Sequence, residues 1–164
     1  MDINKIILLF GKEYRDKELV EFFQKDELDI VKEIKEYMQT DYYQDAESSV
    51  YVENPLAGYS LVFEDELDFF SIEDGIYGES GNYYFICIHI HTQGYEGYEQ
   101  YQGVLINGIK MTDTVEEIRN KLGDNYKRHD FLDVDIWENI NGVKIFIDYK
   151  KKNTPQIISI SLVR

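Results

Sequence analysis

Side-chain alternation in the second half of the chain constrains the fold most strongly. The clearest strand is segment 83–92, YYFICIHIHT, whose side chains fall into two sets on opposite faces: Ile86, Ile88 and Ile90, and Phe85, Cys87, His89 and His91. The same reasoning predicts further strands at 50–52, 61–63, 66–72, 131–140, 143–150 and 157–163. Segment 131–140 alternates through Leu132, Val134 and Ile136, and Asn141–Gly142 after it is a strong hairpin turn.

Helical spacing and capping residues predict helices before and between these strands. The first three are expected within 2–10, 16–24 and 27–38, with Asp2 and Asp16 as N-caps. A later helix is expected within 112–122, capped by Thr112 or Asp113, with Asp113 and Glu116 at capping-box spacing and Gly123 as its stop. Segments 40–49 and 74–82 are polar or turn-rich and predict loops.

Short connections between the strands favour an antiparallel sheet. We therefore predict an α+β fold, in which an antiparallel β-sheet carries the N-terminal helices and the one later helix on one face. The length suits a single domain over residues 1–164. Fourteen Tyr and nine Phe supply a core and argue against disorder.

The charge of −15 is concentrated in one part of the chain. Between Lys35 and Lys110 there is no Lys or Arg, and residues 36–109 carry fourteen of the 32 Asp and Glu. The rest of the chain has eighteen acids and seventeen bases, so it is nearly neutral. This distribution disfavours binding to nucleic acid or an anionic membrane, and it favours a basic protein partner.

Tyrosines lie among these carboxylates, as in segment 94–103, GYEGYEQYQG. Tyr is a favoured interface residue, because it is large, rigid and able to hydrogen-bond. We predict packing for Tyr101, and exposure for Tyr95 and Tyr98 in a Gly-flanked loop. The predicted partner-contacting residues are Asp65, Glu66, Asp68, Glu73, Asp74, Tyr77, Glu79, Tyr95, Glu96, Tyr98 and Glu99.

Chemistry-bearing motifs are few. Cys87, His89 and His91 share a strand face and could ligate a metal, but a closed zinc site needs a fourth ligand that the sequence does not specify. Phosphate-cradling and nucleophile-elbow motifs are absent, and Cys87 suits a small core position better than a nucleophile. We therefore expect no enzyme activity, no cofactor and no metal. A metal-dependent enzyme using Cys87, His89 and His91 is the least favoured alternative.

Three segments resemble small bacterial immunity proteins of polymorphic toxin systems, including those of contact-dependent growth inhibition. They are GVLINGIKMTDTVEEIRNKLGDN at 103–125, IILLFGKEYRDKELVEFFQ at 6–24 and VYVENPLAGYSLVFED at 50–65. The resemblance implies a cytoplasmic protein that binds one toxin and blocks it. A nuclease toxin would suit the charge, because such enzymes present Lys and Arg to phosphate.

The location and the general alternative come from simpler features. The apolar run Ile6–Phe10 is too short for a membrane span and lacks the flanks of a signal peptide, and one Cys cannot form an internal disulfide. Both favour a soluble cytoplasmic protein. The alternative to a toxin inhibitor is a general protein-interaction module with no toxin.

Overall fold

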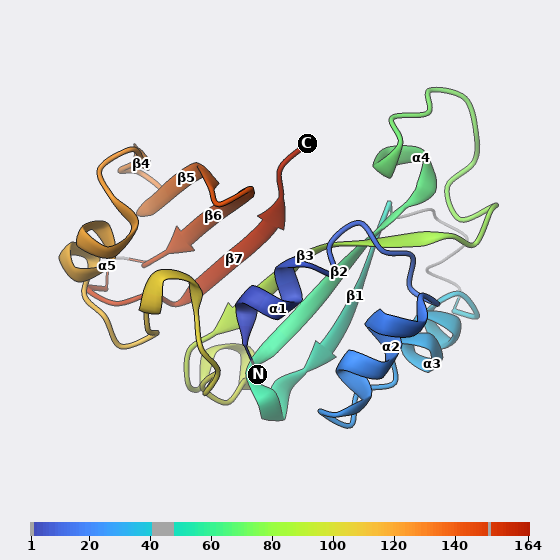
Figure 1. The fold of residues 1–164 in the computed structure, drawn as a ribbon, viewed down its shortest axis with the longest axis horizontal. Coiled ribbons are helices and arrows are strands. Elements are labelled where there is room, and N and C mark those ends of the chain that lie inside the picture. The colour runs from blue at the N-terminus through green and yellow to red at the C-terminus, as the bar shows by residue number, and fades with distance from the viewer. Residues whose placement is uncertain (1, 41–47, 151) are drawn as a thin grey trace. The chain divides into compact units, whose positions relative to one another are not determined.

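The computed structural model describes residues 2–40, 48–150 and 152–164. It contains a seven-stranded antiparallel sheet with helices, which confirms the predicted α+β fold (Figure 1). The strand order is β1-β2-β3-β7-β6-β5-β4. The strands are β1 Ser49–Asn54, β2 Tyr59–Asp65, β3 Tyr83–His91, β4 Lys127–His129, β5 Val134–Ile140, β6 Val143–Asp148 and β7 Ile157–Leu162.

Contacts divide the chain into two compact units. The first comprises Met1–Leu8, Asn54–Ser60 and Cys87–Arg164, and the second comprises Leu9–Glu53 and Leu61–Ile86. The expectation of one domain over 1–164 stays a prediction. None of the helices in the described residues is long and apolar enough to cross a membrane.

The second unit packs two capped helices on strand residues. Helix α2 (Lys17–Gln24) begins after Asp16, whose side chain accepts the backbone N–H groups of Glu18 and Leu19, as predicted. Helix α3 (Ile30–Tyr37) is capped in the same way by Asp29. The buried stripes are Leu19 and Phe23 on α2, and Ile30 and Ile34 on α3. The Phe23 ring meets the Phe85 ring of β3 edge-on, with centroids 5.9 Å apart.

Segment 66–72 is the clearest wrong prediction, because it does not continue as a strand. A short helix, α4 (Glu66–Phe69), follows β2 directly. The Asp65 side chain accepts the backbone N–H of Leu67 and so caps this turn. A loop then runs to β3, and Figure 1 shows it in green, extending away from the strand ends. The predicted loop at 40–49 lies mostly outside the described residues, and the predicted turns at 74–82 are confirmed.

In the first unit, strand register aligns a continuous apolar face. Ile90 pairs with Ile158 and Ile88 with Ile160, and these two β7 residues pair with Ile147 and Ile145 of β6. Ile145 and Ile147 in turn pair with Trp137 and Asp135 of β5. All eight side chains are fully buried. The core face of β5 therefore carries Asp135 and Trp137. Of the predicted set, Val134 is buried, Ile136 is half-buried and Leu132 is exposed.

In the part of the first unit that the structure describes, two helices and three short 3-10 turns accompany the strands. Helix α1 (Ile3–Ile7) is capped by Asp2, as predicted. Helix α5 (Val115–Leu122) ends at Gly123, as predicted, but its cap is Thr114 and not the expected Thr112 or Asp113. Its capping box joins Thr114 to Glu117, while Asp113 instead accepts the backbone N–H of Lys110. The 3-10 turns are η2 Pro55–Ala57, η3 Tyr95–Gly97 and η4 Ile106–Gly108.

Candidate functional site

The strongest candidate for a contact surface is the segment Glu66–Ser80 of the second unit, here called the acidic loop. It carries five carboxylates and no Lys or Arg. It also exposes four large side chains: Phe70 by 54%, Ile72 by 46%, Ile76 by 68% and Tyr77 by 38%. Several large exposed apolar side chains with polar residues around them are a feature of protein contact sites.

Asp65 holds this loop together from beneath. Its side chain is 1% exposed, and its two carboxylate oxygens accept the backbone N–H groups of Leu67 and Gly78, each at 2.9 Å. The predicted role of Asp65 as a partner-contacting residue is therefore corrected. A carboxylate enclosed in this way presents no charge to a partner, and it fixes the two ends of the loop instead.

Further hydrogen bonds fix the loop at both ends. The backbone N–H of Ile72 donates to the Leu67 carbonyl at 2.8 Å, and Glu66 exchanges backbone and side-chain bonds with Asn82. The Tyr77 hydroxyl donates to Asp68 at 2.7 Å, and this bond raises the pKa of Tyr77. These contacts hold the two ends of the loop, which lowers the cost of ordering its backbone when a partner binds.

The loop includes six of the predicted contact residues, and their exposure differs. Glu73, Asp74, Tyr77 and Glu79 are exposed. Glu66 and Asp68 are half-buried and occupied by the bonds described above. The sequence reasoning missed Phe70, Ile72 and Ile76. Their signal was available, because apolar residues that recur among Gly and acids without strand alternation have no obvious core to face.

The other predicted contact residues lie in the first unit, around η3. Tyr98 was expected to be exposed, but it is 5% exposed and its ring stacks on His91 with centroids 3.8 Å apart. That prediction is wrong, whereas the predicted packing of Tyr101 is confirmed by its 5% exposure. Tyr98 acts as a cover for the end of β3, because a flat ring can bury the His91 imidazole.

Tyr95 is half-buried and meets a positive charge. Its hydroxyl hydrogen-bonds to Lys150 Nζ at 3.0 Å, and the same Nζ lies 4.9 Å from the centre of its ring. Glu96 and Glu99 are exposed, and Glu99 accepts the side-chain amide of Gln93 at 2.7 Å. The turn at 94–99 therefore has a positive charge beside its carboxylates, whereas the acidic loop contains no Lys or Arg.

On the Cys87, His89 and His91 face of β3, each histidine ring has one nitrogen beside a serine hydroxyl, while His91 Nδ1 is buried with no hydrogen-bond partner among the described residues. His89 Nδ1 lies 2.7 Å from Ser159 Oγ, and His91 Nε2 lies 3.2 Å from Ser60 Oγ. Burial raises the pKa of the Cys87 thiol to about 12, which suits a core position and not a nucleophile. Among the residues that the structure describes, no group of three or more His, Cys, Asp and Glu side chains is placed to hold a metal ion.

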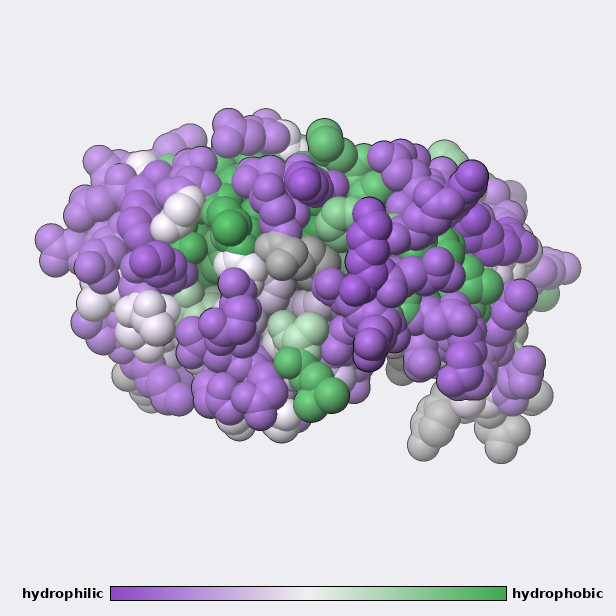
Figure 2. Space-filling model, turned by 60° about the horizontal axis from the view of Figure 1, so that its bottom comes forward, coloured by the Kyte–Doolittle hydropathy of each residue, from purple (hydrophilic) through white to green (hydrophobic). Residues whose placement is uncertain are grey.

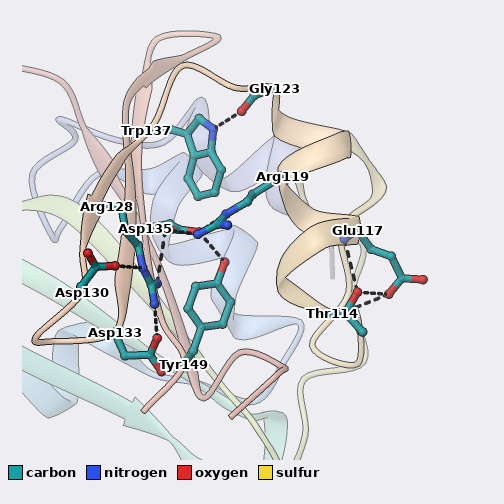
Figure 3. Close-up of polar contacts among 10 residues, drawn as sticks. All are labelled: Thr114, Glu117, Arg119, Gly123, Arg128, Asp130, Asp133, Asp135, Trp137 and Tyr149. Carbon is teal, nitrogen blue, oxygen red and sulfur yellow. Dashed lines mark hydrogen bonds and ion pairs between the residues drawn. The ribbon is translucent and has the colours of Figure 1, made fainter. Parts of the chain in front are cut away.

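A buried charge cluster in the first unit is the second candidate (Figure 3). Asp135 is fully buried and accepts Arg119 Nε and Nη2 at 2.9 and 3.0 Å, Arg128 at 3.3 Å and the Tyr149 hydroxyl at 3.2 Å. Burial raises the pKa of Tyr149, and the neighbouring Asp135 carboxylate raises it as well. The Trp137 indole N–H donates to the Gly123 carbonyl at 2.8 Å.

This cluster is a structural ion-pair network, and it is not an open binding site. Arg119 comes from α5, Arg128 from β4 and Asp135 from β5, so the three side chains join one helix to two strands. Arg128 also binds Asp130 and Asp133 in the turn between the strands. A buried carboxylate needs such partners, and here they consume its hydrogen-bonding capacity.

Comparison with family models, with curated proteins and with solved structures found no match.

On the face drawn in Figure 2, hydrophilic residues dominate, and hydrophobic ones show as separate areas. The acidic loop is therefore identified by its own exposed side chains and charge.

Proposed function

We propose that the protein is a cytoplasmic immunity protein that binds a cognate bacterial toxin and blocks it with the acidic loop. One observation carries the proposal: Phe70, Ile72, Ile76 and Tyr77 are exposed within a fixed segment that has carboxylates and no Lys or Arg. Large exposed side chains supply hot-spot contacts, and carboxylates around them suit a basic surface. Catalysis is no part of this proposal.

A nuclease is the toxin class that the charge suits best. Enzymes that cut nucleic acid present Lys and Arg to phosphate groups. A protein with a charge of −15, concentrated in residues 36–109, would be attracted to such a surface over a distance. Opposite fields raise association rates to about 10⁸–10⁹ M⁻¹s⁻¹ at low salt, which favours rapid neutralisation. The resemblance of segments 6–24, 50–65 and 103–125 to immunity proteins supports the same role.

The first test is binding to the product of the gene directly upstream, where an immunity gene is expected to have its toxin, with growth protection as the cellular readout. The loop variant reverses Glu73, Asp74 and Glu79 to Lys. The control variant reverses Glu21, Glu36 and Asp124 to Lys, which are also exposed and make the same change in net charge. The dissociation constant is measured by calorimetry at low and moderate salt.

We expect the loop variant to lose affinity by tenfold or more, roughly 1.4 kcal/mol, and to show a weaker salt dependence. The control should stay close to the wild type. Equal losses in both variants would show that net charge acts without the acidic loop. If the wild type neither binds the upstream product nor protects cells, the immunity role is wrong, and a general protein-interaction module becomes the better interpretation.

A further inference from the structure

Two turns in the first unit share one sequence pattern and one backbone geometry. Segments 106–110 and 140–144 read INGIK and INGVK. Asn107 and Asn141 both have positive φ, 49° and 55°, and so do the glycines after them, at 70° and 88°. Positive φ at both central residues defines a type I′ turn, and all four residues are exposed. Because their local sequence and backbone geometry match, the two turns can be compared directly, and differences between them reflect their surroundings.

We infer that Asn141 is a site of spontaneous deamidation in the folded protein and that Asn107 is protected from it. The Gly142 backbone nitrogen attacks Asn141 Cγ, forming a new C–N bond. The bond from Cγ to the side-chain nitrogen breaks, and ammonia leaves with the proton from the glycine nitrogen. Water then opens the five-membered succinimide ring at either carbonyl, which gives Asp or isoaspartate. Water is the only co-reactant.

Glycine in the following position makes the attack sterically possible. A Cβ built on Gly142 would meet no atom within 4 Å, so the turn lies in open space. The Asn141 side chain has no hydrogen bond to the described residues, and the Gly142 N–H donates to Asn139 Oδ1 at 2.9 Å in an exposed position. Besides the pairing of Ile140 with Val143, the one contact among the described residues that opposes rearrangement here is this exposed hydrogen bond, and such a bond is readily exchanged for water.

Contacts from α5 hold the turn at Asn107, and the turn at Asn141 has no such contact with a helix among the described residues. Its side-chain amide donates to the Lys121 carbonyl at 3.4 Å, and Lys121 Nζ donates to the Gly108 carbonyl at 3.1 Å. Lys121 is itself fixed by Asp113 at 2.6 Å. The last turn of α5 therefore hydrogen-bonds to both Asn107 and Gly108. Ring closure at Asn107 has to break these contacts as well as rotate the backbone.

The modification would alter the β5–β6 hairpin. Each event replaces a neutral amide by a carboxylate, so it adds one negative charge beside Val143. Isoaspartate also inserts an extra atom into the backbone of a two-residue turn. Ile140 pairs with Val143 across that turn, so the change falls where the turn sets the register of the hairpin.

The experiment follows both sites in one sample of the intact protein. Folded protein is incubated in mildly alkaline buffer, and Asn, Asp and isoaspartate at 107 and 141 are quantified by peptide mapping and mass spectrometry. The same protein in guanidinium chloride supplies the intrinsic rates. An Asn141→Asp variant serves as the chromatographic standard for one product.

We expect Asn141 to convert about tenfold faster than Asn107 in the folded protein, because two additional hydrogen bonds, one at Asn107 and one at Gly108, hold the 107–108 turn. The ratio should fall close to one in guanidinium chloride. Lys121→Ala should accelerate conversion at Asn107 and leave Asn141 unchanged. Equal rates in the folded protein, or conversion of Asn141 only after unfolding, would overturn the inference.

Discussion

The buried carboxylate of Asp65 binds the backbone N–H of Gly78, thirteen residues farther along the chain, at 2.9 Å. The same side chain caps α4 through the backbone N–H of Leu67. One side chain thus closes the base of the acidic loop, while all of its own charge is enclosed. The exposed residues of the loop depend on a carboxylate that never meets solvent.

Replacing Asp65 by Ala should lower the free energy of unfolding by about 1–3 kcal/mol, because the buried Gly78 N–H and the half-buried Leu67 N–H lose their acceptor. Asp74→Ala removes an exposed carboxylate from the same loop and should change stability by less than about 0.5 kcal/mol. Urea unfolding of both variants checks this. A loss of equal size in the two would mean that Asp65 does not organise the loop.

Serine at Phe70 and Ile76 should weaken binding to the product of the upstream gene. Ile76→Ser should cost little stability because Ile76 is 68% exposed, whereas Phe70→Ser also removes ring contacts with Phe69 and Tyr84. Each buried hot-spot side chain is worth about 2 kcal/mol or more. Leu56→Ser and Phe131→Ser are matched controls, since these side chains are 87% and 94% exposed outside the acidic loop. Affinities that fall equally in test and control variants would contradict a specific role of the loop.

Asp135→Asn should destabilise the protein by about 3 kcal/mol, because it leaves Arg119 and Arg128 beside a site that no longer balances their charge. The Asp130 carboxylate binds the same Arg128 but is 93% exposed. Asp130→Asn should therefore cost less than about 1 kcal/mol. Thermal and urea unfolding measure both. Similar losses would show that burial of Asp135 adds nothing to its role.

Stability should fall as the pH falls from 6.5 toward 4, in part because of His91. Burial lowers the pKa of this side chain from 6.5 to about 4, and nearby His89 adds to the effect while Glu96 opposes it. Because the folded pKa lies below the unfolded one, the stabilising contribution is complete above pH 6.5 and is lost as the pH approaches 4. NMR titration of the His91 ring gives the midpoint directly. The urea midpoint of His91→Gln should depend less on pH in this range.

Local chemistry explains which elements could be predicted. Asp2, Asp16 and Gly123 act within a few residues of themselves, and the sequence placed all three correctly. At α5, Thr112, Asp113 and Thr114 can all cap a helix. The selection of Thr114 depends on Asp113 being used by Lys110 and Lys121, and Lys121 lies eight residues away from Asp113.

Long-range partners explain the errors. The residues near Asp65 in sequence do not indicate that it binds the Gly78 N–H. The sequence therefore predicts a surface charge at Asp65, where the structure has a buried carboxylate. The sequence predicts an exposed Tyr98 because it does not show that the His91 face of β3 is covered. In the structure the Tyr98 ring stacks on His91. Asp135 occupies a core position because two arginines from other elements neutralise it, and strand alternation contains no such information.

The position of β7 also sets an order of events during protein synthesis. This strand lies between β3 and β6, and pairs with both. Both neighbours emerge from the ribosome before it, yet they have no direct pairing with each other. Until Ile158 and Ile160 arrive, Ile88 and Ile145 lack the residues that align them. The nascent chain therefore carries two unpaired strand edges until its seventh strand is made, and this interval is when it most needs protection from aggregation.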